Sequence, residues 1–193
     1  MLLRLTQYWV YGGFLSGILI LGLLPEFARH WSLGLLAVFL QLPVYMLHQY
    51  EEHDNDRFRL FVNNAMGGGQ ELLTPLAVFI INVPGVWGVI AASFFLATNV
   101  SLGYGLIAVY LTLVNAIVHV MHSVIFRAYN PGVATAVLFF LPASVFGIVT
   151  LQQTGQIEWY HHLLGILIAI AIHVAIVGYV KSRIIVKNTA QPT

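Results

Sequence analysis

The sequence contains no cysteine and few charged residues, and both shortages limit what the chain can be. Without cysteine there is no disulfide framework and no thiolate metal site, so any metal ligands must be histidines or carboxylates. Charged residues make up 8% of the 193 residues, while 59% are hydrophobic. A typical soluble domain is roughly 25% charged, so this chain has too little polar surface to be one. We predict a polytopic membrane protein.

Basic residues are also scarce, because eight Lys and Arg are nearly balanced by seven Asp and Glu. The formal net charge of +1 provides no basic patch large enough to follow the phosphates of a nucleic acid. We therefore expect no nucleic-acid partner. The partners we expect are the lipid bilayer and a lipophilic small molecule, and the oligomeric state stays open.

Six apolar stretches each come close to the roughly 20 residues that cross about 30 Å of hydrocarbon. They cover approximately residues 8–24, 31–53, 71–97, 102–126, 133–151 and 159–180. Residues 60–70 are too polar to span and predict a short interfacial helix. The prediction is an all-α, polytopic membrane helix bundle of about six transmembrane helices. It forms a single domain over residues 1–187, followed by a disordered tail over residues 188–193.

The basic residues test this count independently, because cytoplasmic loops of membrane proteins carry an excess of Lys and Arg. With six spans, Arg29 alone lies on one side. The other side holds Arg4, Arg57, Arg59, Arg127, Lys181, Arg183 and Lys187. This asymmetry predicts that both termini are cytoplasmic, and we expect the bacterial cytoplasmic membrane as the location.

A cluster of ionisable side chains lies at the end of the second span. His48, Glu51 and Glu52 are spaced i, i+3 and i+4. At about 100° per residue these three side chains share one helix face, and we expect His53 to point away from it. An ionised carboxylate in a membrane helix costs at least about 2.5 to 3.5 kcal/mol, so the two glutamates need partners.

Other spans bring polar side chains to the same side of the membrane and to a similar depth. They are Asn115, His119 and His122 on the fourth span, His173 on the sixth, and Glu71 and Asn82 on the third. Each has a structural interpretation when taken alone: Asn115 can pack helices, and Asn82-Val83-Pro84 can be a helix kink. His30, His161 and His162 are expected to be interfacial. Taken together, the first group predicts one polar layer near the cytoplasmic leaflet.

Two arrangements can stabilise buried carboxylates beside histidines. The acids and imidazoles can share protons, or a cation can neutralise the acids. Imidazole with carboxylate suits a divalent transition metal such as zinc, iron or manganese, and two carboxylates with several histidines can hold a dinuclear site in a helix bundle. The sequence does not choose among these metals.

The motif residues also carry a family resemblance. His48-Gln49-Tyr50-Glu51-Glu52 resembles the His-x-x-Glu-Glu motif of the HXXEE family of integral membrane proteins, and Asn82-Val83-Pro84 resembles that family's Asn-x-Pro motif. The resemblance covers roughly spans two to six. It implies a polytopic helical protein with catalytic or metal-binding signature residues. It also implies a further intramembrane His and Glu, for which the chain offers His119, His122 or His173, and Glu71.

A rival resemblance is to the CAAX-type glutamate intramembrane proteases, which combine Glu-Glu-x-x-x-Arg with histidines on later helices. Here Arg57 follows Glu51-Glu52 one residue too late, and Asn115 stands where that family has Phe before its His, here His119. The resemblance implies a hydrolase without metal, in which a glutamate activates water and histidines stabilise the oxyanion.

Our hypothesis is a membrane-embedded, metal-dependent enzyme that hydrolyses or oxidises a lipophilic or membrane-dissolved small molecule near the cytoplasmic leaflet. The candidate ligands are His48, Glu51, Glu52, His119, His122 and His173. Of these, His48, Glu51 and Glu52 are also the catalytic candidates, with one glutamate as general base. Asn82, Asn115 and Glu71 are candidates to orient ligands or substrate. The alternatives are a proton- or cation-coupled transporter that uses the same layer, and a membrane subunit whose polar layer only holds helices together.

Overall fold

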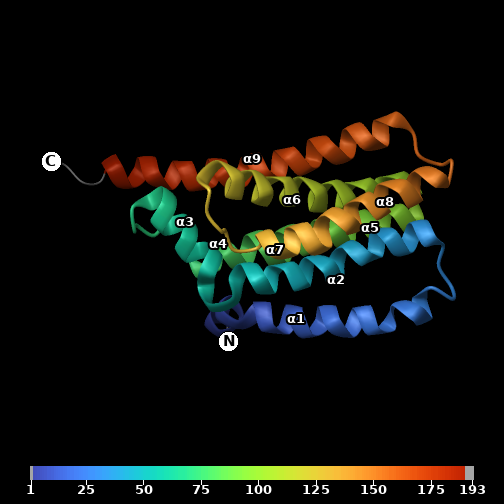
Figure 1. Ribbon diagram of the computed structural model, residues 1–193, viewed down its shortest axis with the longest axis horizontal. Helices are drawn as coiled ribbons and strands as arrows, with labels where there is room; N and C mark the ends of the chain where they lie inside the picture. Colours follow the sequence, from blue (N-terminus) through green and yellow to red (C-terminus); the bar gives the residue numbers. More distant parts are fainter. Residues whose placement is uncertain (1, 190–193) are drawn as a thin grey trace.

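The computed structural model describes residues 2–189, and all regular elements in this range are helical (Figure 1). They are α1 (Leu2–Phe27), α2 (Leu33–His53), η1 (Asp54–Asp56), α3 (Arg57–Gly67), α4 (Pro75–Ile80), η2 (Ile81–Trp87), α5 (Gly88–Asn99), η3 (Leu102–Gly105), α6 (Leu106–Phe126), α7 (Val133–Thr135), η4 (Ala136–Phe140), α8 (Leu141–Gln153) and α9 (Trp159–Thr189). Within this range, six continuous helical stretches are long and apolar enough to cross a membrane. The predicted all-α bundle with six spans is confirmed.

The first and sixth spans differ most from their predicted bounds, and the third begins at Pro75 rather than near residue 71. α1 continues past Pro25 to Phe27, and α9 runs beyond the expected end near residue 180 to Thr189. The expected disordered tail over residues 188–193 lies outside the described residues from residue 190 onward.

The centre of the bundle is α2, which packs against α1 on one side and against α5, α6 and α8 on the other (Figure 1). One face of α2 is buried along its whole length by residues three or four positions apart: Val38, Gln41, Tyr45, His48 and Glu52. α6 buries a similar face with Ala108, Thr112, Ala116 and His119. This spacing gives each helix one inward stripe that carries a histidine at one end, and α2 adds Glu52 there. The ionisable ends of the two stripes face each other.

Two spans contain a π-helical segment. η2 includes Pro84, and η4 precedes α8, which carries Pro142 at its second position. Because proline has no backbone N–H, it breaks the regular α-helical bonding and favours such wider turns. The kink predicted at Asn82-Val83-Pro84 is thus a π-helical turn. The side-chain Nδ2 of Asn82 donates to the carbonyl of Val78 over 2.9 Å.

The short helix α3 lies across one end of the bundle, between the end of α2 and α9 (Figure 1). It corresponds to the predicted interfacial helix, although it starts earlier, at Arg57. Asn63 fixes it in place: its Oδ1 accepts from the backbone N–H groups of Leu72 and Leu73, and its Nδ2 donates to the Leu73 carbonyl. The segment that leads into α4 is therefore tied to α3.

Candidate metal centre

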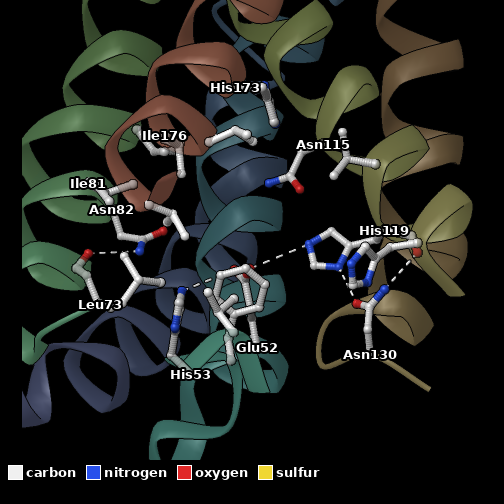
Figure 2. Close-up of a pocket in the computed structure, with 18 of the residues that line it drawn as sticks. Glu52, His53, Leu73, Ile81, Asn82, Asn115, His119, Asn130, His173 and Ile176 are labelled. Carbon is white, nitrogen blue, oxygen red and sulfur yellow. Dashed lines mark hydrogen bonds and ion pairs between the residues drawn. The ribbon is translucent and has the colours of Figure 1, made fainter. Parts of the chain in front are cut away.

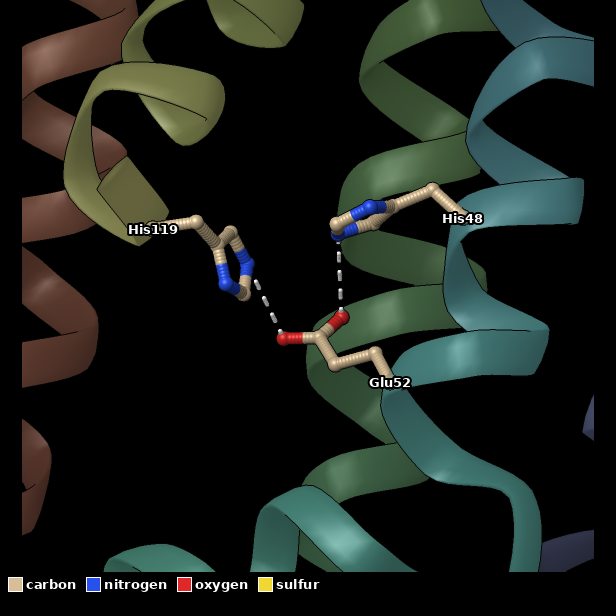
Figure 3. Close-up of side chains that lie close together, drawn as sticks. All are labelled: His48, Glu52 and His119. Carbon is tan, nitrogen blue, oxygen red and sulfur yellow. Dashed lines mark ion pairs between the residues drawn. The ribbon is translucent and has the colours of Figure 1, made fainter. Parts of the chain in front are cut away.

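Three of the predicted ligands meet between α2 and α6 (Figure 3). Nε2 of His48 lies 3.6 Å from Oε2 of Glu52, and Nε2 of His119 lies 3.5 Å from Oε1 of the same carboxylate. One ligand atom from each of the three residues falls within 4.8 Å of the others. All three side chains are buried, with His48 0%, Glu52 6% and His119 4% exposed.

The two His–Glu distances exceed the range of a good hydrogen bond. Two ligands of one tetrahedral ion, each about 2.0 to 2.2 Å from it, lie about 3.4 Å apart, which is close to the spacing found here. Nε2 of His48 has no hydrogen-bond partner among the described residues, although it is fully buried. An unpaired buried nitrogen that faces a carboxylate indicates that a cation or a proton belongs between them.

The tautomer of His119 is set by Asn130 in the loop after α6. Nδ2 of Asn130 donates to the His119 carbonyl over 2.8 Å and to Oγ of Ser123, so this side of the amide carries the hydrogens. Oδ1 of Asn130 therefore accepts from Nδ1 of His119, at 2.7 Å. A neutral imidazole that donates from Nδ1 keeps its lone pair on Nε2, the atom that faces Glu52. Metal-binding histidines are oriented in this way by a second residue.

His48 is oriented through Thr135 and Glu51. The Thr135 hydroxyl donates to Oε2 of Glu51, and it lies 2.9 Å from Nδ1 of His48. Because the hydroxyl hydrogen is used by the carboxylate, the Thr135 oxygen is left to accept from Nδ1–H of His48. The lone pair of His48 is then on Nε2, again facing Glu52. Both imidazoles therefore present an Nε2 lone pair to the same carboxylate.

Glu51 has partners of its own and does not join this group. Its carboxylate accepts from the backbone N–H groups of Ala134 and Thr135, from the Thr135 hydroxyl and from the hydroxyl of Tyr129, 2.6 Å away. Partial burial, with the hydrogen bond to Glu51, raises the pKa of Tyr129 to about 12, so this phenol stays a donor at neutral pH. Four donors identify Glu51 as an ionised acceptor that fastens α7 to α2.

The loop between α6 and α7 approaches the histidines closely at Gly132. Its φ of +100° lies in the region that favours glycine. A Cβ at this position would lie 2.7 Å from Cε1 of His119 and 2.8 Å from Cε1 of His48. Glycine thus allows the loop backbone to cover the two rings.

A cavity of about 230 Å³ adjoins the group (Figure 2). Its polar lining gathers several residues predicted from the sequence, with Asn130 in addition: Glu52, His53, Asn82, Asn115, His119, His122, Asn130 and His173. Most of the remaining wall is aliphatic or aromatic, from α3, α4, η2, α6 and α9. Glu52 and His119 therefore form part of the wall of a largely apolar space, and His48 lies behind them.

Comparison with known protein families shows where this chain belongs. The family model described as "Protein of unknown function with HXXEE motif" matches residues 39–147, more than half of the chain. The chain belongs to this family. No curated protein and no solved structure matched the chain. In this HXXEE protein, His48 and Glu52 of the motif face the candidate metal position, whereas Glu51 bonds Thr135 of α7, the residue that orients His48.

The prediction that His53 points away from the site is wrong. His53 is buried, lines the cavity and places Nε2 3.1 Å from Oε2 of Glu52 (Figure 2). The physical reason is that α2 ends at His53, where Trp9 of α1 and Phe58 of α3 close over the imidazole and turn it toward its neighbour. Apart from this pair with Glu52, neither ring nitrogen of His53 has a polar partner among the described residues.

The other predicted histidines line the cavity without reaching Glu52. His122 packs its ring against Phe61 and Phe126. Nδ1 of His173 donates to the carbonyl of Ala169 in its own helix over 2.8 Å. Of the three histidines that the family resemblance left open, His119 is the one beside Glu52.

The three residues expected to orient ligands or substrate take different places. Asn115 lines the cavity and donates to the hydroxyl of Tyr45. Asn82 also lines the cavity and accepts from Nε2 of Gln49, the residue after His48. Glu71 is exposed, pairs with Arg59 over 3.0 Å and is not part of the cavity lining.

Sequence reasoning missed Asn130 and Thr135. Asn130-Pro131-Gly132 predicts a turn after α6, and nothing in that pattern indicates that the turn folds back over the bundle. Thr135 is the first polar residue of an otherwise apolar span, and a single hydroxyl in such a span indicates helix packing rather than chemistry. The available signal was position alone, since both residues follow His119 on the side of the membrane that carries the motif.

Proposed function

We propose that this HXXEE protein is a membrane-embedded enzyme that uses a divalent transition metal, held by His48, Glu52 and His119, to act on a lipophilic molecule dissolved in the bilayer. One observation carries the proposal: two imidazole lone pairs and one carboxylate converge at the wall of a largely apolar cavity. A site with three protein ligands leaves room for a further ligand, as in catalytic metal sites.

The donor set fits zinc, iron or manganese. Two histidines with one carboxylate occur both in zinc hydrolases and in non-haem iron oxygenases. The three convergent residues are enough for one ion, and the remaining histidines of the cavity, His53, His122 and His173, are available to contact substrate or to transfer protons. When bound, such an ion supplies a Lewis acid that polarises an oxygen of the substrate or of water.

His53 favours hydrolysis over oxidation. Its imidazole lines the cavity and pairs with Glu52, with Nε2 3.1 Å from Oε2, while Nδ1 has no hydrogen-bond partner among the described residues. An imidazole placed beside a candidate metal position can accept a proton from water and later give it to a leaving group.

The depth of the cavity supports an enzyme rather than a transporter. On α2, α6 and η2 the lining ends at Tyr45, Leu111 and Val86. Further along α2 and α6 the bundle is filled by side chains with no exposure, such as Val38 and Leu106, and the buried amide of Gln41 donates to the backbone carbonyls of Ala37 and Ala143. A relay or a transport path needs polar groups that continue to the far side. A blind cavity suits a molecule that enters, reacts and leaves by the same route.

The same proposal places the site near the cytoplasmic leaflet of a bacterial cytoplasmic membrane, on the basis of the basic residues. The absence of cysteine allows a clean test with single substitutions. An impermeant maleimide is expected to label Arg29→Cys in intact cells, and to label Arg127→Cys only after lysis. The reverse pattern would contradict this orientation.

The proposed enzyme can be tested without knowledge of its substrate. Lipid extracts of membranes that carry the wild type, Glu52→Gln or Glu71→Gln are compared by mass spectrometry. We expect a lipophilic species that the wild type and Glu71→Gln consume and Glu52→Gln does not, with consumption lost after chelation of metal. Products whose masses add up to the substrate plus water indicate hydrolysis. Identical extracts from all three would contradict an enzymatic role.

A further inference from the structure

The cavity beside the candidate metal centre is small for the whole of a lipophilic substrate. Its volume of about 230 Å³ lies below the roughly 300 to 1,000 Å³ of sites that enclose a drug-sized ligand. A membrane-dissolved molecule can place its reacting end here, and the rest of it must lie elsewhere. A second space adjoins the cavity.

That space is a groove of about 380 Å³ on the outer surface, between α4 and α9. Its walls are Thr74, Leu76, Ala77 and Ile80 on one side, and Ala175 and Tyr179 on the other. Leu76, Ile80 and Tyr179 are exposed, which within a spanning segment means that they face lipid. Apart from Thr74 and the hydroxyl of Tyr179, the groove is apolar.

The groove and the cavity share two lining residues, Ile81 of η2 and Ile176 of α9. Both are half-buried, and Figure 2 shows them at the same edge of the cavity. These two aliphatic side chains are the boundary between the two spaces. Neither side chain makes a hydrogen bond, so opening this boundary displaces apolar contacts alone.

The aqueous end of the cavity is covered instead. Phe58, Phe61 and Met66 of α3 contribute to its wall there, and Asn63 ties α3 to the backbone at Leu72 and Leu73. Opening this end would break three buried hydrogen bonds, whereas opening the lipid side displaces two aliphatic side chains.

We propose that the groove between α4 and α9 is the lateral entrance of the site and holds the aliphatic tail of a single-chain amphiphile, whose small polar end passes Ile81 and Ile176 to reach Glu52 and His119. This assignment rests on the proposed function and specifies its substrate class. A single aliphatic chain fits the apolar groove, and an oxygen-bearing end group fits the polar end of the cavity. The groove takes one chain, so a two-chain lipid would gain contacts there for only one of its two chains.

The experiment uses the full-length protein in detergent micelles and a photoreactive palmitic acid that carries a diazirine near its methyl end. After irradiation, labelled residues are mapped by mass spectrometry. We expect label on the groove residues of α4 and α9, and its loss when unlabelled palmitic acid is added in excess. Excess phosphatidylcholine should leave the label in place. Label that phosphatidylcholine removes and palmitic acid does not would show that ordinary bilayer lipid occupies the groove, and would overturn the proposal.

Substitutions that fill the groove from either wall provide the second arm. Ala77 and Ala175 line the groove and not the cavity. Ala175→Trp and Ala77→Trp should therefore abolish groove labelling and leave bound metal unchanged. The matched control is Val174→Trp on the same helix, because Val174 is 64% exposed and lines neither space. Full labelling in both groove variants would overturn the proposal. Groove labelling in a protein that binds no metal would support the groove as a binding site for an aliphatic chain and would refute the metal-dependent function.

Discussion

Nδ1 of His119 donates a hydrogen bond to Oδ1 of Asn130 over 2.7 Å, and this bond determines which nitrogen of His119 faces Glu52. The amide of Asn130 cannot turn round, because its Nδ2 is committed to the His119 carbonyl and to Ser123. A loop residue thus orients a histidine of the candidate metal centre.

Asn130→Ala should weaken metal binding by about 10-fold to 100-fold, since residues that orient ligands typically contribute this much. The measurement is a competition titration against a chromophoric chelator. Asn99→Ala is the matched control, because Asn99 is exposed and its amide donates only to the Phe95 carbonyl in its own helix. Equal affinities for the two variants would show that Asn130 does not orient a ligand.

Thr135→Val removes the hydroxyl between Glu51 and His48 at nearly constant volume. The freed imidazole can then place its hydrogen on either nitrogen, so we expect weaker metal binding by about 10-fold. Thr135→Ser, which keeps a hydroxyl, should restore most of the affinity. Thr150→Val serves as control, because the Thr150 hydroxyl bonds only carbonyls of its own helix. A metal affinity of Thr135→Val equal to that of the control would show that the Thr135 hydroxyl does not orient His48.

The two glutamates of the motif should respond in opposite ways to replacement by glutamine. Glu52→Gln should abolish metal binding and leave the metal-free protein as stable as the wild type or more so, because it removes a buried charge. Glu51→Gln places an amide N–H group against existing donors, and should lower the free energy of unfolding by about 1 to 3 kcal/mol while metal still binds. Thermal unfolding with and without added zinc separates the two. Loss of metal in both variants at unchanged stability would contradict the assignment of metal binding to Glu52 and of a structural role to Glu51.

Gly132→Ala should destabilise the protein and impair metal binding together. A left-handed backbone costs a non-glycine residue roughly 1 to 2 kcal/mol, and here the added Cβ also meets both imidazoles at less than 3 Å. Gly155→Ala isolates the backbone effect, because Gly155 has φ of +68° and a Cβ added there would meet nothing within 4 Å. The free energy of unfolding should fall further for Gly132→Ala. Equal losses would mean that the loop does not press on the histidines.

Helical periodicity and charge asymmetry predict the six spans and the meeting of His48 and Glu52 with His119. The i, i+4 spacing of His48 and Glu52 fixes their common face, and the depth of His119 follows from its distance to the helix end. Depth does not determine how a helix is rotated about its own axis. His122 and His173 lie at suitable depths for ligands, yet one packs on aromatic rings and the other bonds its own helix.

The parts of the site that escaped prediction lie where periodicity ends. His53 is the last residue of α2, so its direction is set by Trp9 and Phe58 rather than by helix geometry. Asn130 and Gly132 belong to a loop whose path depends on a left-handed glycine and on hydrogen bonds to α6. Such contacts join residues with no fixed spacing, and a single sequence carries no pattern for them.

The most direct test of the central claim is the metal content of the purified full-length protein, combined with X-ray absorption at the edge of the metal found. The account predicts a bound transition metal whose ligands include two imidazole nitrogens and a carboxylate oxygen at about 2.0 to 2.2 Å, and its loss in Glu52→Gln but not in Glu71→Gln. A wild-type protein that holds no zinc, iron or manganese, both as purified and after incubation with each ion, would contradict it.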